Sequence, residues 1–213
     1  MTAELALWAG AAACALIYLF TAAQPPGLLR SLVKTASVAL LAVAALLAGA
    51  PWLLAVALGL CALGDLFLSR DGEGAFMAGV GAFAAGHLAY AVLFLTRDAS
   101  GPARLLEMPG SAIAGLLLVL GLVMACILAP RAGALKGPVL GYIPIILGMG
   151  AAALTLPLGT WAFAAAAAFM LSDMVLAAET FVLPEDHVLR RITPFAVWPL
   201  YWGAQAGFLA VFS

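Results

Sequence analysis

Apolar residues run through this chain in eight long stretches, which charged residues, prolines and glycine clusters separate. A membrane-spanning helix needs about 20 apolar residues in succession, and a helix satisfies its own backbone hydrogen bonds in lipid. The pattern therefore predicts an all-α, polytopic membrane bundle of eight transmembrane helices that forms a single integral membrane domain over residues 1–213. The predicted spans cover residues 4–23, 31–49, 52–69, 75–95, 111–129, 138–155, 159–178 and 192–212.

Composition supports a membrane protein and excludes a soluble fold. The chain is 66% hydrophobic and 9% charged, whereas soluble domains average roughly 45–50% and about 25%. A formal net charge of −1 provides no basic field for a nucleic acid. The three cysteines, Cys14, Cys61 and Cys126, lie far apart in apolar stretches and indicate small hydrophobic residues. We expect no nucleic-acid partner, no disulfide framework, no obligatory protein partner, and neither a metal nor another cofactor.

The distribution of Lys and Arg predicts the orientation of the chain, since cytoplasmic loops carry the excess of these residues. The even-numbered connections hold only Arg97 and Arg104, and residues 3–23 start with Glu4 and no basic residue, unlike a signal peptide. We therefore expect a multi-pass protein of the bacterial inner membrane with both termini non-cytoplasmic. The odd-numbered connections hold Arg30, Lys34, Arg70, Arg131, Lys136, Arg190 and Arg191.

A short internal sequence similarity links the third and seventh predicted spans. Residues 63–68 read LGDLFL and residues 171–176 read LSDMVL. Both spans run in the same direction, so this weak match would suit a parallel four-plus-four duplication.

Two acidic residues, Asp65 and Asp173, fall inside the predicted spans. A carboxylate at the centre of a spanning helix costs about 2.5–3.5 kcal/mol on insertion scales, so an intramembrane Asp is by default functional. Two carboxyl groups that meet in a low-dielectric pocket cannot both stay ionised, which yields an acid and a base. Asp65 and Asp173 are therefore the candidate catalytic pair, with Lys34, Asp65, Asp173 and Tyr201 all expected in the cytoplasmic half of the membrane.

Structural interpretations of these two residues stay open at this point. Asp65 lies one turn from the end of its span and could reach the interface beside Ser69 and Arg70. Both carboxylates could instead bond to backbone or to Lys34 and hold helices together. The chain has no G-x-S-x-G, Walker lysine loop, C-x-x-C or H-E-x-x-H motif, although a serine beside Asp173 leaves a serine nucleophile formally open.

Polar residues in two aromatic stripes add further candidates. His87 and Tyr90 lie in the fourth span among phenylalanines, and Tyr201 and Gln205 lie in the last. Such stripes serve packing more often than a pocket, but polar groups in a membrane need partners inside the bundle. We expect His87 to donate a hydrogen bond across helices rather than bind metal, because no second His lies within a span.

Four segments together are typical of one family. They occur in order on the third, fourth, seventh and eighth predicted spans, and comprise residues 64–68, 76–94, 169–177 and 201–205. With these segments the chain resembles the YhhN-like family, which includes lysoplasmalogenases, over nearly its whole length. Tyr142 also matches a family position, whereas Thr35 follows Lys34 where the family usually has proline.

The resemblance implies hydrolysis of the vinyl ether bond of lysoplasmalogens, a lysophospholipid substrate dissolved among the membrane lipids, to a fatty aldehyde and a glycerophospho-alcohol. Asp65 and Asp173 would be the catalytic pair, and Lys34 would pair with the substrate phosphate. The remaining candidates would hydrogen-bond the substrate or hold the Asp pair in position, and they are His87, Tyr90, Tyr142, Tyr201 and Gln205. The alternatives are a proton-coupled transporter of small molecules or lipids and a non-catalytic lipid-binding protein.

Overall fold

The computed structural model describes residues 3–24 and 27–213, and this part of the chain folds into eight α-helices without any strand. Four short 3₁₀ helices lie in the connections: η1 (Pro102–Leu105), η2 (Gly133–Leu135), η3 (Leu158–Thr160) and η4 (Val188–Arg191). The predicted all-α class is confirmed. The α-helices are α1 (Ala3–Thr21), α2 (Leu28–Leu47), α3 (Trp52–Leu68), α4 (Glu73–Leu95), α5 (Gly110–Leu128), α6 (Lys136–Leu154), α7 (Ala162–Phe181) and α8 (Thr193–Phe212).

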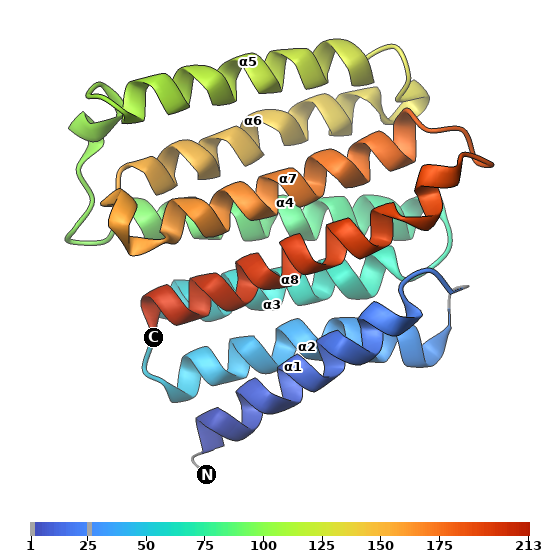
Figure 1. The fold of residues 1–213 in the computed structure, drawn as a ribbon, viewed down its shortest axis with the longest axis horizontal. Helices are drawn as coiled ribbons and strands as arrows, with labels where there is room; N and C mark the ends of the chain where they lie inside the picture. Colours follow the sequence, from blue (N-terminus) through green and yellow to red (C-terminus); the bar gives the residue numbers. More distant parts are fainter. Residues whose placement is uncertain (1–2, 25–26) are drawn as a thin grey trace.

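The lengths and composition of the helices confirm a polytopic membrane bundle. Among the described residues, seven helices are long and apolar enough to cross a membrane. The remaining helix, α3, has 17 residues, which at 1.5 Å per residue is about 26 Å, slightly less than the hydrocarbon thickness. Figure 1 shows α3 lying alongside its neighbours within the same bundle.

The helix bounds lie within two residues of those predicted except at α2 and α7. Helix α2 begins at Leu28 instead of residue 31, so Lys34 lies in its second turn. Helix α7 covers Ala162–Phe181 instead of residues 159–178. Its start is delayed because the chain makes a 3₁₀ turn at Leu158–Thr160 and Trp161 then adopts a left-handed conformation with φ 64°.

The helices alternate in direction, so the four odd-numbered connections gather at one end of the bundle and both termini at the other (Figure 1). We call the first of these the basic end, because seven of the nine Lys and Arg residues lie in or beside its connections. In Figure 1, α1, α8 and α7 lie in front of α2, α3 and α4, and α5 and α6 extend the bundle beyond α7.

Small residues allow the helices to pack closely, as is usual in membrane bundles. On α4, Gly86 packs so tightly against α3 that a Cβ there would lie 2.8 Å from Cys61 Sγ. Between α6 and α7, a Cβ at Gly150 would lie 2.6 Å from Met170 Sδ. The same Cβ would lie 3.2 Å from Leu117 Cδ1, so α5, α6 and α7 approach one another closely at this glycine.

The two halves of the chain each pack their helices in sequence order, and α4 against α6 and α8 against α2 join them. A parallel duplication would make these two junctions equivalent. The α4–α6 junction is far more extensive than the α8–α2 junction. This difference gives the four-plus-four duplication no support from the packing, and the duplication stays a prediction.

Candidate active site within the membrane

A cavity of about 480 Å³ lies inside the bundle towards the basic end. Its apolar lining comes mainly from α5, α6 and α7, and its polar lining residues lie on α1, α2, α3, α6, α7 and α8. Of the described residues that line it, none belongs to the connections at the opposite end. The polar lining residues are Tyr18, Arg30, Lys34, Asp65, Tyr142, Ser172, Asp173, Glu179, Thr180 and Tyr201.

Asp65 occupies the last turn of α3 and is 1% exposed. Its carboxylate accepts a hydrogen bond of 2.7 Å from the Tyr201 hydroxyl on α8, and the Lys34 ammonium on α2 lies 3.0 Å from its other oxygen. Three helices thus converge on one buried carboxylate whose charge a cation balances, as a buried ion requires. Asp65 points into the bundle rather than to the interface, and Thr35 in place of the family's proline leaves Lys34 within reach of it.

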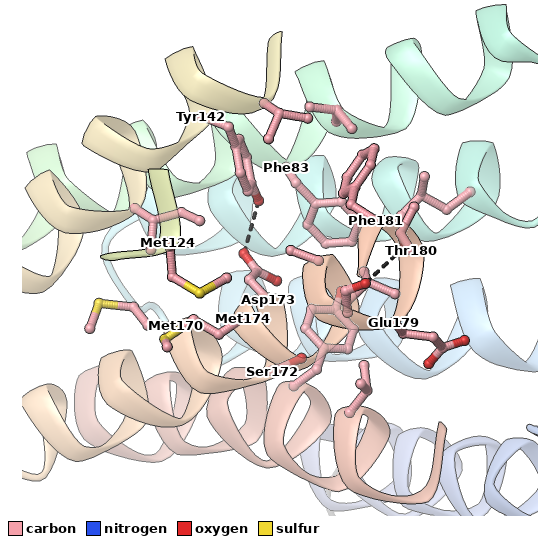
Figure 2. Close-up of a pocket in the computed structure, with 18 of the residues that line it drawn as sticks. Phe83, Met124, Tyr142, Met170, Ser172, Asp173, Met174, Glu179, Thr180 and Phe181 are labelled. Carbon is pink, nitrogen blue, oxygen red and sulfur yellow. Dashed lines mark hydrogen bonds between the residues drawn. The ribbon is translucent and has the colours of Figure 1, made fainter. Parts of the chain in front are cut away.

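Asp173 lies in the later half of α7, and its side chain is 13% exposed. The Tyr142 hydroxyl on α6 donates a 3.0 Å hydrogen bond to its Oδ2 atom (Figure 2). His87 Nε2 on α4 lies 3.4 Å from the same oxygen. Asp173 therefore has a tyrosine and an imidazole as partners, but no Lys or Arg side chain of the described chain forms an ion pair with it.

The geometry of His87 fixes where its ring protons lie. Its Nδ1 atom is 2.8 Å from the backbone oxygen of Phe83. Because a carbonyl oxygen can only accept, Nδ1 must carry the hydrogen, and Nε2 is left to face Asp173. A proton between these two residues can lie on Nε2 or on the carboxyl group. The buried ring packs at 4.2 Å against that of Phe169, which fixes its orientation.

Tyr90 and Gln205 are fully buried and do not line the cavity. The Tyr90 hydroxyl donates a 2.5 Å hydrogen bond to the Gln205 side-chain oxygen, which links α4 to α8. Of the eight predicted site residues, five line the cavity and three lie behind its wall. The five are Lys34, Asp65, Tyr142, Asp173 and Tyr201, and the three are His87, Tyr90 and Gln205.

The structure adds residues that the sequence did not single out. Arg30 lies one turn before Lys34 on α2, at the i, i+4 spacing that places both on one helix face, so that spacing was an available signal. Glu179 lines the cavity at the basic end and accepts a short hydrogen bond from Thr193. Figure 2 shows Met124, Met170 and Met174 on one side of Asp173, and Phe181 and Glu179 on the other.

The fold and the site define a class: a multi-pass helical membrane protein with three carboxyl groups, those of Asp65, Asp173 and Glu179, lining one intramembrane cavity. The sequence profile of the YhhN family matches residues 29–212, so the chain belongs to the YhhN family. The resemblance inferred from the sequence is thereby confirmed. No curated protein sequence and no solved structure matches the chain.

Proposed function

We propose that this protein is an intramembrane hydrolase that cleaves the vinyl ether bond of lysoplasmalogens. One observation carries the proposal: Asp65 and Asp173 line the same cavity, which continues into an apolar chamber. The cavity volume of about 480 Å³ falls in the usual range for small-molecule sites, about 300–1,000 Å³. The cavity thus places carboxyl and hydroxyl groups beside an apolar space that can hold a fatty chain.

Cleavage of a vinyl ether begins with protonation of its outer alkene carbon. This step creates an oxocarbenium ion, water adds to its carbon, and the hemiacetal collapses to an aldehyde and an alcohol. The reaction needs a positioned acid and a nearby anion, as glycoside hydrolysis does.

Asp173 is the better candidate for the acid. Its partners are the Tyr142 hydroxyl and the imidazole of His87, neither of which carries a permanent charge. The carboxyl group can donate its proton to the alkene carbon. The Asp173 carboxylate can then take up a proton from the water that adds, and His87 Nε2 at 3.4 Å can share it.

Asp65 is the better candidate for the anion. The Lys34 ammonium at 3.0 Å and the Tyr201 hydroxyl at 2.7 Å hold it as a carboxylate. A fixed negative charge beside the cavity stabilises a cation that forms there, because the surrounding dielectric is low. The same carboxylate can orient the attacking water.

The apolar chamber suits the single fatty chain of a lysolipid. Helices α5, α6 and α7 line it with leucines, isoleucines and the three methionines of Figure 2, which adapt to irregular shapes. Contact between α5 and α7 is sparse. We propose that the lipid reaches the cavity sideways through this seam.

The first prediction concerns product formation. Purified protein given a 1-alkenyl lysophospholipid should release a long-chain aldehyde that mass spectrometry detects. In D₂O the aldehyde should carry one deuterium on the carbon next to its carbonyl group, because an acid delivers that proton. Asp173→Asn and Asp65→Asn should each lower kcat about 10²–10⁴-fold.

Asp98→Asn is the matched control, since Asp98 lies in the α4–α5 connection and does not line the cavity. It should leave the rate unchanged. Well-folded protein that releases no aldehyde would contradict the proposal and favour the proton-coupled transporter. Full activity in either site variant would refute the role assigned to that residue.

A further inference from the structure

A second, smaller pocket opens beside the polar part of the cavity at the basic end. It measures about 70 Å³, which is room for several water molecules. Four residues line both spaces, namely Tyr18, Arg30, Lys34 and Leu68. The pocket therefore continues the reaction cavity towards the end of the bundle. Its other lining residues are Gly27, Ser31, Ser69, Arg70 and Asp71.

The two cations at this boundary differ in how their charge is balanced. Lys34 is engaged by Asp65 at 3.0 Å. Within the described chain no carboxylate forms an ion pair with Arg30. Its guanidinium donates to the backbone oxygen of Ala22 at 2.9 Å and reaches the Tyr18 hydroxyl at 3.5 Å. Its Nε atom is buried and has no hydrogen-bond partner among the described residues.

A guanidinium with unused donors at the edge of a polar pocket is suited to an oxyanion with two or more oxygen atoms. The same pocket is lined by the hydroxyl groups of Tyr18, Ser31 and Ser69, of which Ser69 donates to the Asp65 backbone oxygen at 2.7 Å. Ser31 is 4% exposed and has only a long contact of 3.5 Å with the Ser69 backbone oxygen, so its hydrogen can turn to a ligand. With Arg30, Lys34 and Arg70, the lining holds three positive charges against the single carboxylate of Asp71.

We propose that Arg30 and this side pocket bind the phosphate of the lipid headgroup. The inference rests on the proposed function for the identity of the lipid, but it moves the phosphate contact from Lys34, where the sequence placed it, to Arg30. Lys34 stays with Asp65, because withdrawing it would leave a buried carboxylate without a counter-ion.

The spacing along the pocket fits a glycerophospholipid. Arg30 and Lys34 both lie over the Tyr18 ring, at 5.6 and 5.7 Å from its centroid. The Asp65 carboxylate lies just beyond Lys34. Only a three-carbon glycerol unit separates the ether oxygen of the substrate from its phosphate ester oxygen. The glycerol would lie beside Tyr18, with the ether at the carboxyl groups and the phosphate at Arg30.

Binding of two probes without a vinyl ether tests the phosphate site apart from catalysis. One probe is a 1-O-alkyl lysophosphoethanolamine, and the other is the 1-O-alkylglycerol of the same chain, which lacks phosphate. Arg30→Gln should raise the Kd of the phosphate-bearing probe about 10–100-fold, as loss of a charged hydrogen-bond pair does. The Kd of the alkylglycerol should stay unchanged, which also shows that the variant is folded.

Arg131→Gln is the matched control, because Arg131 lies at the same end, bonds to the Ile127 backbone oxygen at 2.6 Å, and lines neither pocket. It should change neither Kd. Arg30→Lys should recover only part of the lost affinity, since a lysine supplies charge without the planar fork. An unchanged Kd of the phosphate-bearing probe in Arg30→Gln would overturn the assignment.

Inorganic phosphate separates the two sources of the anion. If Arg30 binds a lipid headgroup, millimolar phosphate should displace the lysolipid only weakly. Equal Kd values for both lipid probes, together with Arg30-dependent binding of inorganic phosphate, would overturn the headgroup assignment in favour of a soluble anion. Arg30-dependent lysolipid binding by a protein that releases no aldehyde would support the phosphate site while refuting the proposed hydrolysis.

Discussion

At the scale of single residues, the two buried carboxyl groups are distinguished by their partners. Asp65 is held by an ammonium and a hydroxyl group, and Asp173 by a hydroxyl group and a neighbouring imidazole. The local sequence does not show this difference, because residues 63–68 around Asp65 and residues 171–176 around Asp173 are alike. The asymmetry arises from the residues that other helices bring to each carboxyl group.

The stability of the Lys34–Asp65 pair can be tested without substrate. Lys34→Met should lower the free energy of unfolding by about 3–5 kcal/mol, because it leaves a buried charge without its partner. The double variant Lys34→Met/Asp65→Asn should regain most of that loss. Unfolding of the purified variants by a denaturing detergent measures both. A double variant no more stable than Lys34→Met would show that the two residues are not coupled.

The sequence could identify the acidic residues but not their contacts. Asp65 and Asp173 stand out because carboxylates are rare in apolar spans. The partnership of Tyr142 and His87 with Asp173 depends on how α4, α6 and α7 pack, which no local pattern encodes. The sequence does not distinguish Arg30 as a site residue, because membrane orientation already explains a basic residue near the end of a span.

At the scale of elements, close packing of α3 on α4 sets the distance between the backbone of Asp65 on α3 and that of His87 on α4. Gly64, Gly79 and Gly86 all lie where a Cβ would come within 3.0 Å of a side chain on the facing helix. At Gly86 the neighbouring atoms are Cys61 Sγ at 2.8 Å and the Ala57 backbone oxygen at 3.4 Å. The backbone atom cannot move aside without shifting α3.

Gly86→Ala should therefore destabilise the protein by about 1–3 kcal/mol, the usual cost of overpacking. Gly81→Ala is the control on the same helix, because Gly81 is exposed and has nothing within 4 Å of the added Cβ. Its stability should be unchanged or slightly higher, since alanine favours the helix. Thermal unfolding in detergent compares the two. Equal melting temperatures would contradict the close α3–α4 contact.

Helix positions were predictable where hydrophobicity alone decides them. The spans of α3 and α8 differ from their predicted bounds by one residue each. Helix α7 is shifted because Trp161 takes a left-handed conformation that apolar patterns do not reveal. The start of α2 at Leu28 was missed because Arg30, a charged residue, lies inside its first turn.

At the scale of the whole molecule, the gathering of basic residues at one end predicts its orientation in the membrane. We expect the basic end to face the cytoplasm. Single cysteines at Leu106 and Val188, which are 87% and 63% exposed at opposite ends, test this in a background without the three native cysteines. In right-side-out vesicles a membrane-impermeant maleimide should label the cysteine at residue 106 and spare the one at residue 188. The reverse pattern would contradict the expected orientation.

The bundle as a whole was predictable in its number of helices but not in their arrangement. Long apolar stretches separated by polar breaks define each span. The order in which the spans pack depends on side-chain shape around small residues such as Gly150 and Gly121, which differs little from the rest of an alanine-rich chain. That packing, and not the pattern of hydrophobicity, creates the cavity.

The described residues that line the cavity include none from the connections at the end that carries the termini, and Gly150 packs closely on Met170 and Leu117. Two routes lead from this cavity: the proposed opening between α5 and α7 into the bilayer, and the side pocket at the basic end. If the proposed reaction takes place there, its two products leave by different routes. The apolar aldehyde would dissolve in the surrounding bilayer. The water-soluble glycerophospho-alcohol would leave at the basic end. Hydrolysis would therefore release the headgroup on one side of the membrane only.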